Sequence, residues 1–494
     1  MTNNNNQKKR QFFGTDGVRG TVGAYPLVPD FVTRLGYAAG VVLSRRASHP
    51  TFMIGRDTRQ SGEMLQSALT TGLLASGATV IDLGVITTPG VAFMVGKLGA
   101  EAGVVISASH NPVKENGIKF FSAEGLKLNE DIECEIESML DLPIDLSQIT
   151  AGQYGRRIDG TDMRELYVDA LVDEHQDISL EGLRLVLDCA NGASSWYAPE
   201  VFSRLGADVI VIHASPTGTN INEQAGSEHV RREPQDLFAL IQQYQANFGI
   251  VFDGDADRVI FVDESGHLVD GDHMLAILAD YLTSQDRLLA DTVVSTNMRN
   301  GALVNFFAER KISFIETPVG DKYVMEALRQ LRSETDQKEL IGLGGEQSGH
   351  IILMDETHNT GDGLRSGIFL IRAFLESGQK TLAALAESIH KYPQVVASAV
   401  VAEKIELERL QPVMTLKDQL KDLLPGLTRL NLRYSGTEPK VRLMLEADNR
   451  HTEQDLAEQA FALCDAVQNA TGTLPGSFLE VLNVTQGGLV PRLG

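Results

Sequence analysis

Three aspartates alternate with small residues in the segment VFDGDADR, directly after an apolar stretch that is typical of a strand. Two carboxylates about 4 Å apart repel each other by about 4 kcal/mol at an effective dielectric of 20, so a cluster of three is costly unless a cation lies among them. Ligands that are all oxygen favour Mg²⁺ over zinc. Asp253, Asp255 and Asp257 are therefore candidate metal ligands, and Arg258 follows them directly.

Two other interpretations of this segment stay open. In water the same repulsion falls to about 1 kcal/mol, which would permit a solvated acidic turn. Asp253 could itself be a nucleophile, because a carboxylate after a strand can form an acyl phosphate. An EF-hand is excluded, because Arg258 occupies the sixth position, where that loop requires glycine, and because strands flank the segment.

A serine and a histidine follow another apolar stretch in AGVVISASHNP. Ser109 and His110 would lie at the carboxyl end of a parallel strand, where open α/β sheets bind ligands. Lys119 comes shortly afterwards, at the start of a second strand segment, and a desolvated lysine can act as an acid or a base. An ordinary Asn-Pro turn and a solvated lysine are the alternative interpretations.

Two segments further along carry groups that suit a sugar phosphate. The glycine-rich sequence LGGEQSGH offers Glu346, Ser348 and His350, whose polar atoms could bond to sugar hydroxyls. Asp321 and Lys322 stand at the expected start of a helix, where a phosphate is favoured. A structural glycine turn would explain the first of these segments equally well.

The segment RYSGTEPKVR supplies guanidinium, hydroxyl and backbone donors around one turn. Arginine forks match the geometry of a phosphate dianion, so we expect a phosphate-binding loop here, with a purely structural turn as the alternative. Its candidate ligands are Arg433, Ser435, Gly436, Thr437 and Arg442.

Alternating strands and helices must position these segments. From Thr51 the pattern is strand, helix, strand, helix and strand, and it restarts near Leu183 and again after about Gly271. Such alternation predicts largely parallel sheets with crossover connections. The sequence thus predicts three similar mixed or parallel α/β units, although no residue-level repeat relates them.

The last hundred residues differ, with expected strands at 395–406 and 441–447 and a final helix capped by Thr452. They predict a smaller α+β domain, and the tail from about Leu474 has no assigned role. The expected domains are residues 1–165, 166–265, 266–390 and 391–494.

Length and composition limit the classes of protein to which the chain can belong. A chain of 494 residues is too long for one hydrophobic core and suggests about three or four domains. The net charge of −23 opposes binding to nucleic acid or acidic membranes, so an anionic ligand would need a local cationic pocket. No P-loop or G-x-G-x-x-G fingerprint occurs, which leaves a P-loop NTPase or a Rossmann dehydrogenase unsupported.

We expect a cytoplasmic location. The sequence has no apolar run of roughly 18 residues and no apolar signal region at its polar start. Its cysteines, Cys134, Cys189 and Cys464, are too few for a disulfide framework and too far apart for a CxxC motif, which agrees with a reducing compartment.

In order, GTDGVRG, ISASHNP, DGDADR, GEQSGH and RYSGTEP resemble the motifs of the α-D-phosphohexomutase family, from Gly14 to Arg442. The resemblance implies four domains around a central cleft. It implies a phosphoserine at Ser109 and one Mg²⁺ per chain, held by that phosphate and the three aspartates. GEQSGH would contact the sugar and RYSGTEP its phosphate. Lys119 matches a lysine implicated in proton transfer, and Arg19 an arginine beside the reacting phosphate.

Within the family, Gln347 and Glu438 resemble the branch that acts on glucosamine 6-phosphate more than the branches that act on mannose or glucose phosphates. The implied reaction makes glucosamine 1-phosphate through a sugar bisphosphate, which also serves as activator, and feeds UDP-N-acetylglucosamine and cell-wall synthesis. The implied partner is a hexosamine phosphate, and a homodimer is one implied assembly. A mannose- or glucose-specific mutase, a metal-dependent phosphatase using Asp253 and a non-catalytic sugar-phosphate sensor stay as alternatives.

Overall fold

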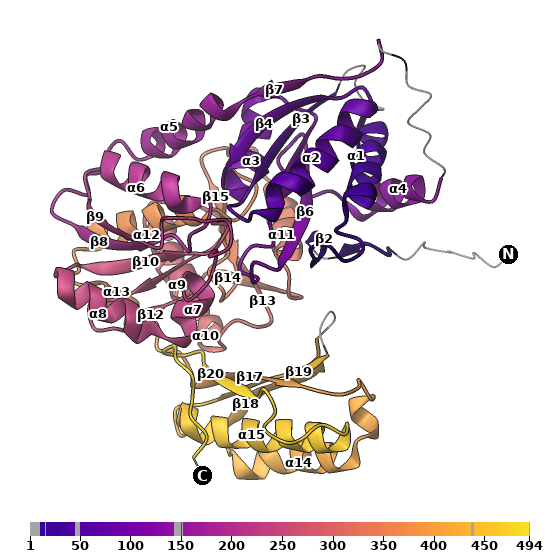
Figure 1. The fold of residues 1–494 in the computed structure, drawn as a ribbon. Coiled ribbons are helices and arrows are strands. Elements are labelled where there is room, and N and C mark those ends of the chain that lie inside the picture. The colour runs from indigo at the N-terminus through magenta and orange to yellow at the C-terminus, as the bar shows by residue number, and fades with distance from the viewer. Residues whose placement is uncertain are drawn as a thin grey trace.

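The computed structural model describes residues 10–14, 16–44, 50–142, 150, 152–435 and 439–493. The strands of these residues form four sheets, one in each of four consecutive parts of the chain, which we call domains 1 to 4 (Figure 1). Three α/β units followed by a smaller α+β unit confirm the predicted fold class. The exact domain boundaries stay a prediction.

Domain 1 has a mixed sheet in the order β1-β2-β6-β5-β3-β4-β7. β3 pairs in parallel with β4 and β5, whereas β6 runs antiparallel to β5. The strands are β1 (Phe13–Gly14), β2 (Gly17–Thr21), β3 (Thr51–Arg56), β4 (Thr79–Val85), β5 (Ala102–Ile106), β6 (Glu115–Ser122) and β7 (Arg157–Asp159). The helices are α1 (Pro29–Leu43), α2 (Ser61–Ala75), α3 (Thr88–Leu98) and α4 (Glu130–Leu140).

Domain 2 has the sheet order β12-β11-β10-β8-β9, with β8 parallel to β9 and β10. Its strands are β8 (Arg184–Asp188), β9 (Asp208–Ile212), β10 (Phe248–Phe252), β11 (Val259–Val262) and β12 (Leu268–Val269). Its helices are α5 (Glu165–Glu174), α6 (Ser194–Arg204), α7 (Ser227–Arg232) and α8 (Pro234–Tyr244).

Domain 3 has the order β14-β13-β15-β16, with β13 parallel to β14 and β15. Its strands are β13 (Leu288–Thr296), β14 (Ser313–Thr317), β15 (Ile341–Gly345) and β16 (Ile351–Met354). Its helices are α9 (Gly271–Ser284), α10 (Ala302–Glu309), α11 (Asp321–Arg332), α12 (Gly363–Ser377) and α13 (Leu382–Ala386).

Domains 1 to 3 share one local arrangement that bears on function. In each, a strand paired in parallel on one side is followed by a strand that pairs with it antiparallel: β5 by β6, β10 by β11 and β15 by β16. The connecting loops all leave the carboxyl end of a strand of the parallel set, where ligands bind in open α/β sheets. Each of these three loops contains one of the predicted motifs.

The hydrophobic cores separate domain 4 from the rest. One cluster of buried residues runs through domains 1, 2 and 3 and includes Phe93, Phe252 and Phe369. Domain 4 has its own cluster, around Val395, Leu443 and Leu456. Buried apolar surface therefore joins the first three domains, and contacts of other kinds must hold the fourth.

Domain 4 is an antiparallel sheet in the order β18-β19-β17-β20, with two helices on its outer face (Figure 1). Its elements are β17 (Gln394–Val400), α14 (Gln411–Leu423), β18 (Leu427–Tyr434), β19 (Lys440–Ala447), α15 (Glu453–Ala470) and β20 (Glu480–Asn483). Thr452 caps α15 as predicted, with Oγ1 accepting from the N–H of Asp455 at 3.2 Å.

The predicted strand over 395–406 is wrong beyond Val400. β17 is paired with β19 only as far as Lys440, where β19 begins, and the last backbone bond runs from Val401 to the carbonyl of Pro439 at 2.9 Å. Among the described residues no strand pairs with 401–406, and β17 ends at Val400.

The C-terminal tail joins domain 4 to domain 2. β20 adds to the free edge of β17, and the following residues fold back on it. The N–H groups of Gly488 and Leu489 donate to the carbonyls of Arg231 (2.8 Å) and Arg232 (3.2 Å), at the end of α7. The tail that had no assigned role is thus part of the fold.

Candidate active site

Ser109 lies on the loop after β5, almost fully buried, with a φ of 51° in the left-handed region. Its N–H donates to Ser107 Oγ at 2.9 Å, and its carbonyl accepts from Asn222 Nδ2 at 2.9 Å and Arg59 Nη2 at 3.2 Å. A non-glycine residue persists in this strained region only where its surroundings over-determine it. These bonds therefore hold the hydroxyl of Ser109 in a fixed place.

Three of the residues that fix this loop were not predicted from the sequence. Arg59 and Asp57 form a fully buried ion pair beneath it, and Asp57 Oδ2 accepts from Ser107 Oγ at 2.7 Å. Asn222 reaches the loop from domain 2. The available signal was the segment DTR directly after β3, since charged residues at a strand end are candidates for a site.

The three predicted metal ligands lie on the loop between β10 and β11. Asp253, Asp255 and Asp257 are buried, and one carboxylate oxygen from each lies within 4.8 Å of the others. Ser109 Oγ donates to Asp253 Oδ2 at 2.5 Å. Gly254 permits this approach, because a Cβ there would lie 2.6 Å from the carbonyl oxygen of Ser109.

This cluster has the properties of a cation site. Asp255 Oδ1 and Asp257 Oδ1 are buried and have no hydrogen-bond partner among the residues that the structure describes. Burial, together with the charges of Asp257 and Asp255, raises the pKa of Asp253 well above its usual value. A divalent cation would relieve this repulsion and occupy the unpartnered oxygens, so the residues fit a metal.

Lys119, on β6, is buried beside the same cluster, so the solvated-lysine interpretation is wrong. Its Nζ lies 2.8 Å from Asp255 Oδ2 and 3.4 Å from Asp257 Oδ2. Burial by itself would lower the pKa of Lys119, but the charges of Asp16, Asp255 and Asp257 raise it above its usual value. The ammonium group is therefore charged.

His110 lies beside Ser109, and the charges of two arginines act on it. His110 Nδ1 is 3.3 Å from Ser109 Oγ and 3.0 Å from Arg258 Nη1. Burial and the charge of Arg258 lower the pKa of His110 to about 4, and Arg19 on β2 adds to this effect. His110 is thus neutral near pH 7, with positive charge around it.

Glu346, Gln347, Ser348, Gly349 and His350 form the loop between β15 and β16, which we call the sugar loop. Glu346 Oε1 accepts from the N–H of Gly320 at 3.1 Å. His350 is buried. Its Nδ1 lies 3.8 Å from Asp257 Oδ1, and its Nε2 lies 3.6 Å from Asp321 Oδ2. The sugar loop therefore lies next to the loop that carries Asp253, Asp255 and Asp257.

Asp321 and Lys322, at the start of α11, both contact domain 1. Asp321 Oδ2 lies 2.7 Å from Lys127 Nζ, and Lys322 Nζ lies 2.7 Å from Glu130 Oε1. Lys322 is therefore already engaged by a carboxylate, which weakens its candidacy as a phosphate ligand.

The predicted phosphate-binding residues lie in domain 4. Arg433 and Arg442 are direct cross-strand neighbours on β18 and β19, and burial together with the charge of Arg442 lowers the pKa of Arg433. Like charges directly opposite each other are unfavourable unless an anion joins them. Ser435, directly after β18, is buried. Gly436 and Thr437, like Glu438, fall outside the described residues.

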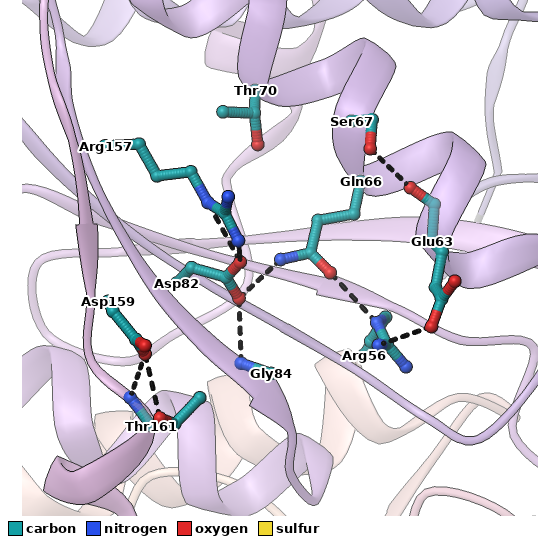
Figure 2. Close-up of a pocket in the computed structure, with 10 residues that line it drawn as sticks. All are labelled: Arg56, Glu63, Gln66, Ser67, Thr70, Asp82, Gly84, Arg157, Asp159 and Thr161. Carbon is teal, nitrogen blue, oxygen red and sulfur yellow. Dashed lines mark hydrogen bonds and ion pairs between the residues drawn. The ribbon is translucent and has the colours of Figure 1, made fainter.

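A separate groove of about 550 Å³ lies between α2, β4 and β7 in domain 1 (Figure 2). Several of its polar groups are paired with one another: Asp82 accepts from Arg157, from Gln66 at 2.5 Å and from the N–H of Gly84 at 2.8 Å. None of its lining residues belongs to the three motif loops. It is a polar groove, distinct from the site around Ser109.

Comparison with known proteins places the chain in a family. Four models of the phosphoglucomutase/phosphomannomutase family match in sequence order: α/β/α domain I at residues 10–142, domain II at 165–266, domain III at 270–392 and the C-terminal domain at 375–463. The chain belongs to the phosphoglucomutase/phosphomannomutase family, and it is a phosphohexomutase enzyme.

Within this family, the chain is similar in sequence to proteins named phosphoglucosamine mutase. The phosphoglucosamine mutase of Methylobacillus flagellatus is 43% identical, over 92% of this chain and 98% of its own length. That of Bacillus subtilis is 42% identical, over 89% and 95%.

Solved structures share the fold. A phosphoglucomutase/phosphomannomutase family protein from Burkholderia thailandensis has a TM-score of 0.71 at 24% identity, covering 95% of this chain and 99% of its own. The N-acetylphosphoglucosamine mutase of Aspergillus fumigatus, solved with GlcNAc-6P and magnesium, has a TM-score of 0.64 at 18% identity, covering 94% of this chain and 96% of its own.

In the part of the chain that the structure describes, no helix has both the length and the apolar character needed to span a membrane.

Proposed function

We propose that the chain is a phosphoglucosamine mutase, which interconverts glucosamine 6-phosphate and glucosamine 1-phosphate through a phosphorylated Ser109. The observation that carries this proposal is the contact of Ser109 Oγ with Asp253 at 2.5 Å, inside a buried cluster of three carboxylates. The substrate is supported by relatives named phosphoglucosamine mutase at 42–43% identity and by the same fold in a structure with bound GlcNAc-6P and magnesium.

Phosphoryl transfer requires in-line positioning and compensation of the charge on the transferred oxygens. The bond between Ser109 Oγ and phosphorus breaks as the free sugar hydroxyl bonds to phosphorus. We assign the proton transfer to Lys119, which is held beside Asp255: its charged ammonium would give a proton to Ser109 Oγ as that bond breaks and then take up the proton that the sugar hydroxyl loses. Arg19 and Arg258 would add positive charge next to Ser109, and neutral His110 would orient its oxygen.

Asp253, Asp255, Asp257 and the phosphate on Ser109 would hold one Mg²⁺, which supplies charge neutralisation at the phosphoryl oxygens when bound. The sugar bisphosphate then turns over in the site, and its other phosphate returns to Ser109.

Glu346, Ser348 and His350 would contact the sugar. Arg433, Ser435 and Arg442 would bind the phosphate that is not reacting, with Gly436 and Thr437 completing that loop. Asp321 and Lys322 stay weaker candidates.

Comparing kcat/KM for glucosamine 6-phosphate, glucose 6-phosphate and mannose 6-phosphate tests the substrate. We expect at least a tenfold preference for the amino sugar, which corresponds to about 1.4 kcal/mol of differential transition-state stabilisation. Equal or better turnover of mannose 6-phosphate would make the chain a phosphomannomutase.

Intact-mass measurement with site mapping tests the mechanism. A single phosphate on Ser109 and isomer formation without release of inorganic phosphate are expected. Release of phosphate without isomerisation would favour a phosphatase that uses Asp253, and ligand binding without phosphoserine would favour a sensor. The homodimer and the cytoplasmic location stay predictions.

A further inference from the structure

Gln347, in the middle of the sugar loop, is turned into the protein, and only 6% of it is exposed. Its Nε2 makes two hydrogen bonds, to Asp272 Oδ2 at 2.7 Å and to Gln394 Oε1 at 2.8 Å. Both hydrogens of the amide nitrogen are therefore used inside the protein.

The two acceptors belong to different domains and are themselves fixed. Asp272 lies in the first turn of α9, and its Oδ2 also accepts from the N–H of Asn300 at 3.0 Å. Gln394 is the first residue of β17, and its N–H donates to Thr485 Oγ1 at 2.9 Å. One side chain of the sugar loop thus bonds to domain 3 and to the first strand of domain 4.

This bridge matters because domain 4 has a core of its own, and a small set of polar contacts joins it to domain 3. Arg429 donates to the backbone carbonyls of Asn297 and Arg299, and Glu446 accepts from the N–H of Gly301 at 2.7 Å. None of those contacts involves a residue of the sugar loop, whereas the contact through Gln347 joins that loop directly to domain 4.

The neighbouring charged donor is already engaged, because Lys391 Nζ lies 3.8 Å from Asp272 Oδ2 but bonds to Asp270 Oδ2 at 2.6 Å. Asp272 Oδ1 and Gln394 Nε2 are already buried without a hydrogen-bond partner among the described residues. Loss of the Gln347 donors would leave Gln394 Oε1 without this bond and Asp272 Oδ2 with only the N–H of Asn300, and a buried acceptor without its donor carries a desolvation penalty. The loop and the strand would then relax independently.

We propose that Gln347 is a positioning residue that couples the sugar loop to domain 4, so that Glu346 and Ser348 keep their place relative to the phosphate-binding arginines of that domain. The proposal rests on the proposed function, since it concerns how the two ends of a sugar phosphate are held at once. Gln347 acts through its neighbours and does not contact the substrate.

The test compares Gln347→Met, which keeps the side-chain size but removes both donors, with Arg429→Met, which loosens domain 4 without touching the sugar loop. For Gln347→Met we expect kcat/KM for glucosamine 6-phosphate to fall about tenfold, with most of the loss in KM. Hydrogen exchange, measured without substrate, should accelerate in peptides covering 345–350 and 394–400. For Arg429→Met it should accelerate around 297–299 and 427–434, with the sugar loop unchanged.

Unchanged KM and unchanged exchange of the sugar loop in Gln347→Met would overturn the proposal, and so would equal exchange of that loop in both variants. If Gln347→Met does not fold, Gln394→Met removes only the bond to domain 4 and should still accelerate exchange at 345–350. A wild-type protein that fails to isomerise glucosamine 6-phosphate would refute the proposed function, whereas the exchange result would stand on its own.

Discussion

The hydroxyl of Ser109 contacts Asp253 and lies outside the hydrophobic cores of the described residues. We therefore expect Ser109→Ala to lower mutase activity by about a thousandfold or more while leaving the far-ultraviolet circular dichroism spectrum unchanged. Steady-state assays together with thermal melts check this. Isomerisation by the variant at the wild-type rate would contradict a phosphoserine mechanism.

The cluster of aspartates makes a second prediction. Asp255→Asn removes one negative charge from the site. In the wild type Asp255 Oδ2 accepts from Thr88 Oγ1 at 2.6 Å, and the amide oxygen of asparagine can still accept this bond. We expect the variant to need a higher Mg²⁺ concentration for half-maximal activity and to lose about a hundredfold in kcat/KM. Asp82→Asn, in the groove of Figure 2, is the matched control and should leave the Mg²⁺ dependence unaltered. Activity that is insensitive both to Asp255→Asn and to chelators would refute the metal site.

Residue types were enough to select Ser109, Lys119 and the three aspartates as candidates, because carboxylates and nucleophiles after strands are visible in the sequence. The resemblance added Arg19, whose role no spacing reveals. Arg59 and Asn222 were missed because they donate to backbone carbonyls of a distant loop, which leaves no local pattern. Asp57 was missed because its partners are Arg59 and the Ser107 hydroxyl of that loop. The direction in which Gln347 points depends on a strand of another domain, so it could not be read from its own loop.

Among the helices, α5 ends beside a buried histidine that should make stability depend on pH. Burial lowers the pKa of His175 from 6.5 to about 4, and neither ring nitrogen has a hydrogen-bond partner among the described residues. As the pH falls from about 6.5 to about 4, the unfolded chain binds a proton that the folded chain does not. The free energy of unfolding should therefore fall by about 3 kcal/mol over this range.

The variant His175→Phe tests this assignment, because its ring can keep the edge-to-face contact with Phe369, whose centroid lies 4.8 Å away. We expect the difference in Tm between pH 7.5 and pH 5 to be smaller in this variant than in the wild type. His267→Asn, at an exposed position on the surface of domain 2, should not reduce that difference. An unchanged pH profile in His175→Phe would assign the acid sensitivity to other groups.

Element types followed from periodicity, which is a local property of the chain. Leu65, Leu69 and Leu73 recur at helical spacing and are buried on α2, and the predicted cap at Thr452 starts α15. Strand ends were less predictable, because a strand stops where its partner stops, as β17 does opposite Lys440. The short strand β20 was missed because its burial comes from the sheet it joins and not from its own sequence.

At the scale of the whole molecule, we expect the C-terminal tail to hold domain 4 in place. Truncation after Leu474 removes β20, the bonds to the end of α7 and the buried side chains of Val481 and Val484. We expect a lower Tm and faster protease cleavage near residues 388–393, between domains 3 and 4. Truncation after Pro491 is the control, because it removes Arg492, whose ion pair with Asp465 lies inside domain 4. Equal cleavage rates in the two truncated chains would show that the tail does not restrain the domain.

We expect the same tail also to keep the protein monodisperse. β17 is rich in valine and alanine, and β20 satisfies the backbone groups along one of its sides. The chain then folds back so that Leu482 bridges to Leu489, which shields β20 itself. An uncovered, apolar strand at the margin of a sheet is a template for pairing with another molecule. Loss of the last twenty residues should therefore cause concentration-dependent association, visible as rising light scattering at temperatures well below unfolding.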